Sequence, residues 1–172
     1  MIFILDPELT GSPDAMRVLI IEDNAVNAFC LSRLIESVVA SVSIDVVNNS
    51  QDALSCIETQ LPDLVIIDGE LNLIDESSTH GPQLAAAILQ KYPHLPLIAW
   101  SDSEFMRGAF AKVFVQYNRL VNEYNTWAKT VRPECIQKTW AYYFDEAANE
   151  QQQTFSHVTR AKRQASYHLD YI

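Results

Sequence analysis

The sequence predicts an α/β fold, in which a doubly wound parallel β-sheet is covered by helices on both faces. Five short apolar runs alternate with segments whose apolar residues recur at helical spacing. The run at residues 64–67 is continuously apolar and rich in β-branched side chains, as expected for a strand buried on both faces. Two of the runs end in acidic residues, and ligands of open α/β sheets bind at the carboxyl ends of the strands.

Length and charge exclude several classes of protein. The 172 residues suit one domain, and the net charge of −10 argues against direct nucleic-acid binding, which depends on Lys and Arg neutralising phosphates. No apolar run reaches membrane-spanning length, and residues 1–5 lack the basic flank of a signal peptide. The three cysteines have neither disulfide-framework nor zinc-site spacing, so we expect a cytoplasmic protein without a membrane partner.

Residues 1–15 are predicted to form an irregular leader, because proline and glycine recur there. Met16 directly precedes the first strand-like run, so translation starts at either Met1 or Met16. A single α/β domain is predicted to span residues 16–148.

The remaining elements follow from apolar periodicity. Strands are predicted at residues 17–21, 43–47, 64–68, 97–100 and 126–128. The first helix, from about residue 25, is expected to bury Val26, Phe29, Cys30, Leu34 and Val38. The second contains residues 53–57, Gly81-Pro82 opens the third, and the last two cover residues 103–122 and 134–148.

The C-terminal segment, residues 149–172, is predicted to be a helical extension or a tail. Its Gln-rich start favours a solvated tail, whereas Phe155, Val158, Ala165 and Leu169 fall on one helical face. As a helix it would mediate dimerisation or dock onto the acidic body of the protein.

Polar residues follow the predicted strands at their carboxyl ends. Glu22 and Asp23 follow the first strand, Asp68 ends the third, Ser101 follows the fourth and Lys129 follows the fifth. In an open α/β sheet these ends lie at one edge, and carboxylates gathered there repel one another unless a cation joins them. Such oxygen ligands suit Mg²⁺. The pattern predicts a Mg²⁺ site where a carboxylate accepts a phosphoryl group, with a hydroxyl and a lysine nearby.

Each of these residues also has a purely structural interpretation. Glu22 and Asp23 would favour the N-terminus of the first helix through its dipole. Ser101 would be an N-cap, a role for which residues 102 and 103 compete. Lys129 would be a solvated surface lysine.

In their order, these motifs resemble the receiver domain of bacterial two-component response regulators, in particular single-domain, chemotaxis-regulator-like receivers. The resemblance rests on an apolar strand before Glu-Asp-Asn, a strand before Asp-Gly, a strand before Ser, and a lysine ahead of the last helix. It implies the flavodoxin-like sheet order 2-1-3-4-5.

The resemblance also implies a role for each site residue. Asp68 would be the phosphoacceptor, Ser101 the switch hydroxyl, and Lys129 the contact to the phosphoryl oxygen. The implied Mg²⁺ ligands are Glu22, Asp23, Asp68 and the main-chain carbonyl of Glu70.

Several positions depart from the family pattern. Leu-Asn at residues 71–72 replaces the family's Met-Pro pair, and the loop that follows is longer. Asp102 stands where the family has a small residue, and its charge is expected to repel an incoming phosphoryl group. Thr130 replaces the common proline after the lysine, and the interval between the switch hydroxyl and the lysine is longer. These departures favour an alternative, a degenerate pseudo-receiver that acts as an interaction or scaffold protein.

The function that the resemblance implies is a stand-alone receiver in a phosphorelay, a switch and not a metabolic enzyme. A histidine kinase or phosphotransfer protein would phosphorylate Asp68. A downstream protein target would read the change on the face of the fourth helix, fifth strand and fifth helix. A third interpretation, a phosphatase or phosphotransferase on a related fold, would need Glu70 as its general acid or base.

Overall fold

The computed structural model describes residues 15–72 and 78–145, in which strands and helices alternate. The strands are β1 (Met16–Ile21), β2 (Val42–Val47), β3 (Leu64–Asp68), β4 (Leu97–Trp100) and β5 (Thr126–Trp127). The helices are α1 (Ala25–Val38), α2 (Ser50–Thr59), α3 (Gly81–Lys91), α4 (Glu104–Gln116) and α5 (Pro133–Phe144).

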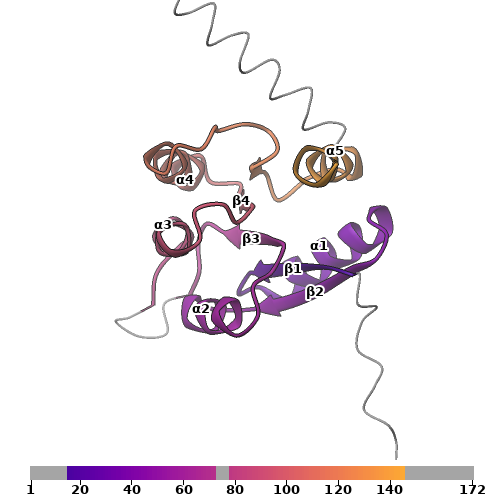
Figure 1. The fold of residues 1–172 in the computed structure, drawn as a ribbon, viewed down its shortest axis with the longest axis horizontal. Coiled ribbons are helices and arrows are strands. Elements are labelled where there is room, and N and C mark those ends of the chain that lie inside the picture. Colours follow the sequence, from indigo (N-terminus) through magenta and orange to yellow (C-terminus); the bar gives the residue numbers. More distant parts are fainter. Residues whose placement is uncertain (1–14, 73–77, 146–172) are drawn as a thin grey trace, which may run out of the picture.

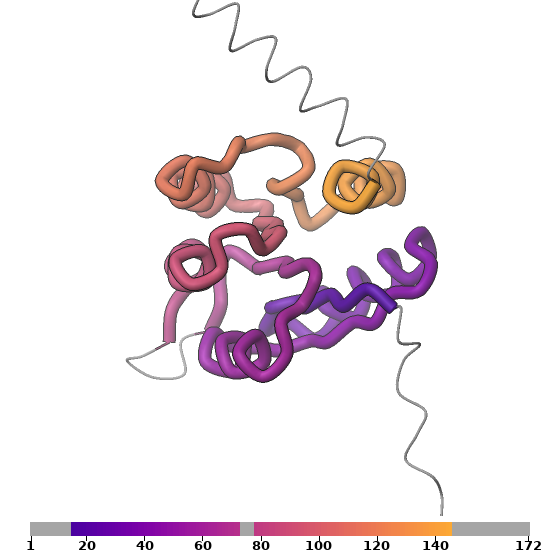
Figure 2. Tube along the Cα trace, viewed as in Figure 1, coloured from indigo at the N-terminus to yellow at the C-terminus, as the bar shows by residue number. Residues whose placement is uncertain are grey.

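The five strands form one parallel sheet in the order β2-β1-β3-β4-β5, which confirms the predicted fold class and strand order. From β1 the chain moves to the edge strand β2, returns to β3 on the other side of β1, and then continues through β4 to β5 (Figure 2). Strand β3 is buried along its whole length, as its continuous apolar run predicts.

The strand register decides which side chains meet at the carboxyl edge of the sheet. Ile21 of β1 pairs with Ile67 of β3, so Glu22 and Asp68 each come one position later and lie level with each other. Asp68 itself pairs with Trp100 of β4, which pairs with Trp127 of β5. The residues that follow these strands therefore emerge together.

Helices cover both faces of the sheet. Helices α1 and α5 lie on one face, and α2, α3 and α4 lie on the other (Figure 1). Each face has its own apolar core, so the alternating side chains of β1, β3 and β4 are buried on either side.

The predicted buried face of α1 is partly wrong. Val26 and Phe29 are 69% and 66% exposed, and Cys30 is exposed too, whereas Ala28, Leu31 and Ile35 are buried. Asn24 caps this helix through hydrogen bonds from the amides of residues 26 and 27, and the buried stripe starts at Ala28. Both stripes have helical spacing, so the spacing alone cannot distinguish them.

Helix α4 is shorter than predicted and ends at Gln116 rather than at residue 122. Asn118 adopts the left-handed conformation with φ of 55°, and its N–H donates to the carbonyl of Val115. The N–H of Arg119 donates to the carbonyl of Phe114 at 2.8 Å. This pair of bonds is a Schellman motif, which terminates the helix and redirects the chain.

The last helix spans Pro133–Phe144 instead of the predicted residues 134–148: it begins one residue earlier and ends earlier, with Asp145 as its C-cap. Ile136 is buried, and Trp140 and Tyr143 pack against the same core, so the predicted inner face of the helix is correct. The predicted leader, apart from Ala15, and the predicted extension at residues 149–172 lie outside the described residues, as does the middle of the long loop after Asp68. Within the described ranges, no helix combines the length and apolarity needed to cross a bilayer.

Candidate functional site

Three carboxylates gather at the carboxyl edge of the sheet. Glu22, Asp23 and Asp68 each offer one oxygen, and these oxygens lie within 4.8 Å of one another. Glu22 and Asp68 are almost completely buried, and Asp23 is half-buried. We call these three residues the acidic cluster. Hard oxygen ligands in this number and spacing fit a small divalent cation such as Mg²⁺.

Backbone amides of neighbouring loops hold two members of the acidic cluster. The N–H of Asn24 donates to Oε1 of Glu22 at 3.0 Å, and the N–H of Asn72 donates to Oδ2 of Asp23 at 2.8 Å. The second bond fastens the loop after β3 to the loop after β1, which positions Asp23 beside the end of β3.

Lys129 provides the positive charge at this edge. Its Nζ lies 2.9 Å from Oδ1 of Asp68 and also forms an ion pair with Glu22. One ammonium thus serves two of the three carboxylates. Lys129 is therefore not the solvated surface lysine of the structural interpretation.

Two further residues fix Lys129, and neither role is evident from the sequence. Its Nζ stands 3.8 Å from the centroid of the Trp100 ring, a cation–π geometry over the residue that ends the fourth predicted strand. Its backbone N–H donates to Oδ1 of Asp102 at 2.8 Å. The carboxylate of Asp102 is therefore engaged with the loop after β5.

Ser101 follows β4 and is buried beside the acidic cluster. Its Oγ accepts a hydrogen bond from the N–H of Ser103 at 3.1 Å, so its own proton remains available for donation. The cap of α4 is Ser103, whose Oγ accepts from the N–H of Met106. The structural interpretation of Ser101 as the helix cap is therefore wrong.

Two glycines allow the backbone after β3 to approach its neighbours closely. A Cβ on Gly69 would lie 2.9 Å from Oγ of Ser101 and 2.8 Å from Cβ of Met106. A Cβ on Gly81 would lie 2.0 Å from the carbonyl oxygen of Asp68. The N–H of Gly81 donates to the carbonyl of Gly69 at 3.1 Å. Glu70, the next residue, is exposed, and its side chain is outside the acidic cluster.

Burial raises the pKa of both Glu22 and Asp68. The hydrogen bonds from Lys129 lower both pKa values, and the mutual repulsion within the acidic cluster raises them, but desolvation is the largest cause. The negative charge at this edge is therefore undercompensated by the protein alone, which is the electrostatic condition expected of a cation site.

The structure thus brings together Glu22, Asp23, Asp68, Ser101 and Lys129, which the sequence identifies as candidate site residues. It adds Trp100 and Asp102 as the residues that hold the lysine. The sequence contained one signal for Asp102, its position directly after Ser101, where the resembled family has a small residue, but the hydrogen bond of Asp102 depends on the fold.

A comparison with protein families identifies one match. Residues 18–115 match the model of the response regulator receiver domain, a stretch that contains most of β1, all of β2 to β4 and most of α4. No curated protein matches this chain.

Solved structures with the same fold are similar to this chain at low sequence identity. The receiver domain of a modulated diguanylate cyclase from Desulfovibrio desulfuricans G20 is 23% identical with a TM-score of 0.60, covering 80% of this chain and 99% of that one. The receiver domain of an HD domain-containing protein from Pseudomonas fluorescens Pf-5 is 18% identical with a TM-score of 0.63, covering 76% and 95%. The receiver domain of NtrX from Brucella abortus is 15% identical with a TM-score of 0.59, covering 75% and 98%.

Proposed function

Because this chain belongs to the response regulator receiver family, we propose that it receives its signal as a phosphoryl group on Asp68, in the presence of Mg²⁺. The observation that carries this proposal is the placement of Asp68, whose carboxylate lies in the acidic cluster and contacts Nζ of Lys129 at 2.9 Å. A carboxylate that can act as a nucleophile, oxygens at ligand spacing and a lysine ammonium thus lie within one small volume, which supports the proposal.

The residues of the acidic cluster fit Mg²⁺ because their oxygens converge at ligand spacing and their charge exceeds that of the one lysine. We propose Glu22, Asp23, Asp68 and the main-chain carbonyl of Glu70 as ligands. When bound, Mg²⁺ would neutralise charge on the transferring phosphoryl oxygens.

The chemical step is an in-line transfer to a carboxylate. A carboxylate oxygen of Asp68 forms a bond to phosphorus, while the bond between phosphorus and its donor breaks, and the electron pair of that bond leaves with the donor. A phosphohistidine of a histidine kinase or phosphotransfer protein is the proposed donor. The contact with Lys129 favours the ionised form of Asp68, which is the nucleophilic form.

After transfer, we expect Lys129 to contact a phosphoryl oxygen, since its Nζ already lies against Asp68. Ser101 would donate its hydroxyl proton to a second oxygen. Because Lys129 is tied by its backbone to Asp102, directly after Ser101, a shift of either residue also affects the other. This connection links the phosphorylation site to the loops that lead into α4 and α5.

Signalling would then occur through protein contact in the cytoplasm, as a switch and not through catalytic turnover. The surface around α4, β5 and α5 is the proposed contact face for a downstream protein or a second copy of this chain, and Phe105 and Val115 are large apolar residues exposed on α4. We do not propose direct contact with nucleic acid or membrane.

The test is the intact mass of the full chain after incubation with acetyl phosphate, with and without Mg²⁺. We expect a Mg²⁺-dependent gain of one phosphoryl group in the wild type and none in Asp68→Asn. A folded wild-type protein that gains no mass would favour the alternative, a pseudo-receiver that acts by interaction alone.

A further inference from the structure

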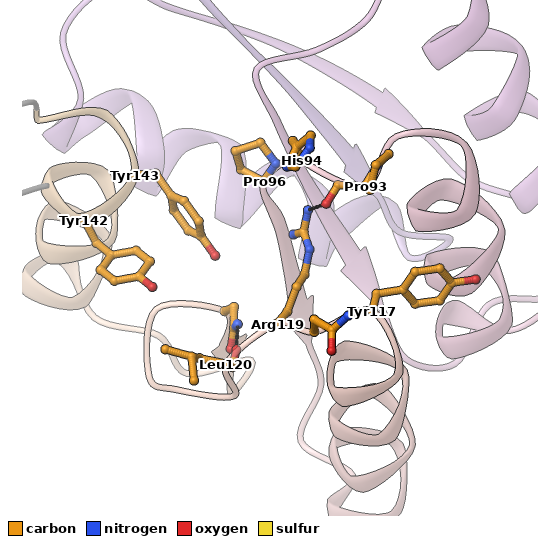
Figure 3. Close-up of a pocket in the computed structure, with 10 residues that line it drawn as sticks. Pro93, His94, Pro96, Tyr117, Arg119, Leu120, Tyr142 and Tyr143 are labelled. Atoms are coloured by element: carbon orange, nitrogen blue, oxygen red, sulfur yellow. Dashed lines mark hydrogen bonds between the residues drawn. The ribbon is translucent and has the colours of Figure 1, made fainter. Parts of the chain in front are cut away.

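A cavity of about 550 Å³ lies at the edge of the sheet opposite the acidic cluster (Figure 3). Residues just before β4 and β5 line it, together with the end of α4 and two tyrosines of α5. Its volume falls within the range of small-molecule sites in proteins.

Arg119 crosses the centre of this cavity, with Tyr142 and Tyr143 on one side of it and Tyr117 on the other (Figure 3). The Schellman motif at the end of α4 places it there, because Asn118 turns the chain and the N–H of Arg119 closes the helix. The position of the guanidinium is thus set by backbone structure as well as by its own contacts.

No carboxylate pairs with Arg119 among residues 15–72 and 78–145. One terminal nitrogen donates to the carbonyl oxygens of Pro93 and Leu95, both at 2.7 Å. Those bonds explain a structural role, but the other N–H groups of the guanidinium have no acceptor within the described residues. Burial lowers the pKa of Arg119, although a guanidinium stays charged at neutral pH. The cavity therefore holds a positive charge that the described part of an otherwise acidic chain does not neutralise.

Aromatic, proline and leucine side chains form part of the cavity walls. Tyr142 and Tyr143 line the cavity with aromatic rings, Pro93 and Pro96 also line it, and Leu120 is 74% exposed. A planar apolar group can pack against such side chains, and one guanidinium can bind one carboxylate in a forked pair.

We propose that this cavity binds a small aromatic carboxylate, whose carboxylate pairs with Arg119 and whose ring lies against the tyrosine and proline walls. Such a site is separate from the phosphorylation site, because it is at the amino ends of β4 and β5. The ligand would contact the end of α4 and the end of α5 together.

The probe is 2-naphthoate, titrated into the full chain and followed by amide chemical shifts and calorimetry. We expect saturable binding, with shifts concentrated at residues 93–96, 117–120 and 142–143. The uncharged match, 2-naphthylmethanol, should bind much more weakly. Equal binding of the alcohol would overturn the proposal, as would the absence of saturable naphthoate binding at about 1 mM.

Leu120→Asp provides a variant that leaves the guanidinium and its carbonyl contacts in place. It adds a negative charge at the opening and should weaken naphthoate binding about fivefold, the effect of one unit charge about 4 Å away in water. Val26→Asp, at a residue of similar exposure on α1, is the matched control and should bind as the wild type does. Arg119→Lys retains charge but loses the fork, and should also weaken binding. Unchanged affinity in Leu120→Asp and Arg119→Lys would refute the assignment.

Discussion

Replacing Asp68 with Asn should stabilise the metal-free protein, even though it alters the proposed phosphoacceptor. The oxygens of the acidic cluster lie within 4.8 Å of one another. At an effective dielectric constant of about 20, the two repulsions on Asp68 each cost about 3.5 kcal/mol or more. The attraction between Nζ of Lys129 and Asp68 at 2.9 Å offsets about 5.7 kcal/mol of these two repulsions at the same dielectric constant. The net cost of the Asp68 charge is therefore about 1 kcal/mol, before the desolvation that raises its pKa is added.

Urea unfolding in EDTA, followed by tryptophan fluorescence, measures this difference. We expect Asp68→Asn to raise the free energy of unfolding by about 1–2 kcal/mol, which corresponds to about 2–8 °C in Tm for a protein of this size. Glu70→Gln is the matched control, because Glu70 lies two residues after Asp68 and has the same charge on an exposed side chain outside the acidic cluster. This variant should change the free energy of unfolding by less than about 0.5 kcal/mol. In Mg²⁺ at tenfold its Kd, the wild type should gain about 1.4 kcal/mol and the variant less. An Asp68→Asn protein that is less stable than the wild type in EDTA would refute the electrostatic reasoning.

Three further predictions concern the same site. Gly81→Ala should destabilise the protein by several kcal/mol, because the new Cβ would lie 2.0 Å from a backbone oxygen. Gly108→Ala, on the exposed side of α4, should instead stabilise the protein by about 0.5–1 kcal/mol, and chemical unfolding of both variants measures the difference. Asp102→Asn keeps an acceptor for the Lys129 amide and removes the negative charge, so it should speed phosphorylation by acetyl phosphate about fivefold. A rate no faster than that of the wild type would show that this charge does not repel the donor. In EDTA, the free energy of unfolding should fall as the pH rises from the ordinary carboxyl pKa values of 3.8 and 4.5 through the raised pKa values of Asp68 and Glu22 in the folded protein. The reason is that the folded state binds more protons than the unfolded state in this pH window. Urea unfolding at several pH values tests this, and a rise in stability over the window would contradict it.

Much of the fold could be predicted because parallel strands produce strong signals. The continuous apolar run before Asp68 indicates a central strand, and the alternation of strands and helices gives the doubly wound class. Helix boundaries were less predictable. The end of α4 depends on the left-handed conformation of Asn118, and the sequence contains no glycine there to indicate it. The inner face of α1 depends on where its cap lies, since two apolar stripes have similar spacing.

The acidic cluster was predictable because the register of a parallel sheet places residues after neighbouring strands at one edge. The contacts of Lys129 were not, because they depend on side-chain directions. The cation–π contact of Trp100 with Nζ and the hydrogen bond from the Lys129 amide to Asp102 both depend on the fold, so the sequence does not indicate either contact. The contacts of Arg119 were unpredictable for the same reason, since they join the connection before β5 to the connection before β4.

A crystal structure of the full chain with Mg²⁺ and beryllofluoride tests the central claim most directly, because beryllofluoride mimics a phosphoryl group on a carboxylate. We expect beryllium bonded to a carboxylate oxygen of Asp68, Mg²⁺ held by Glu22, Asp23 and Asp68, and fluorines within hydrogen-bond distance of Ser101 and Lys129. Beryllofluoride absent from Asp68 in crystals that hold Mg²⁺ elsewhere would contradict the proposed phosphoacceptor and its metal site together.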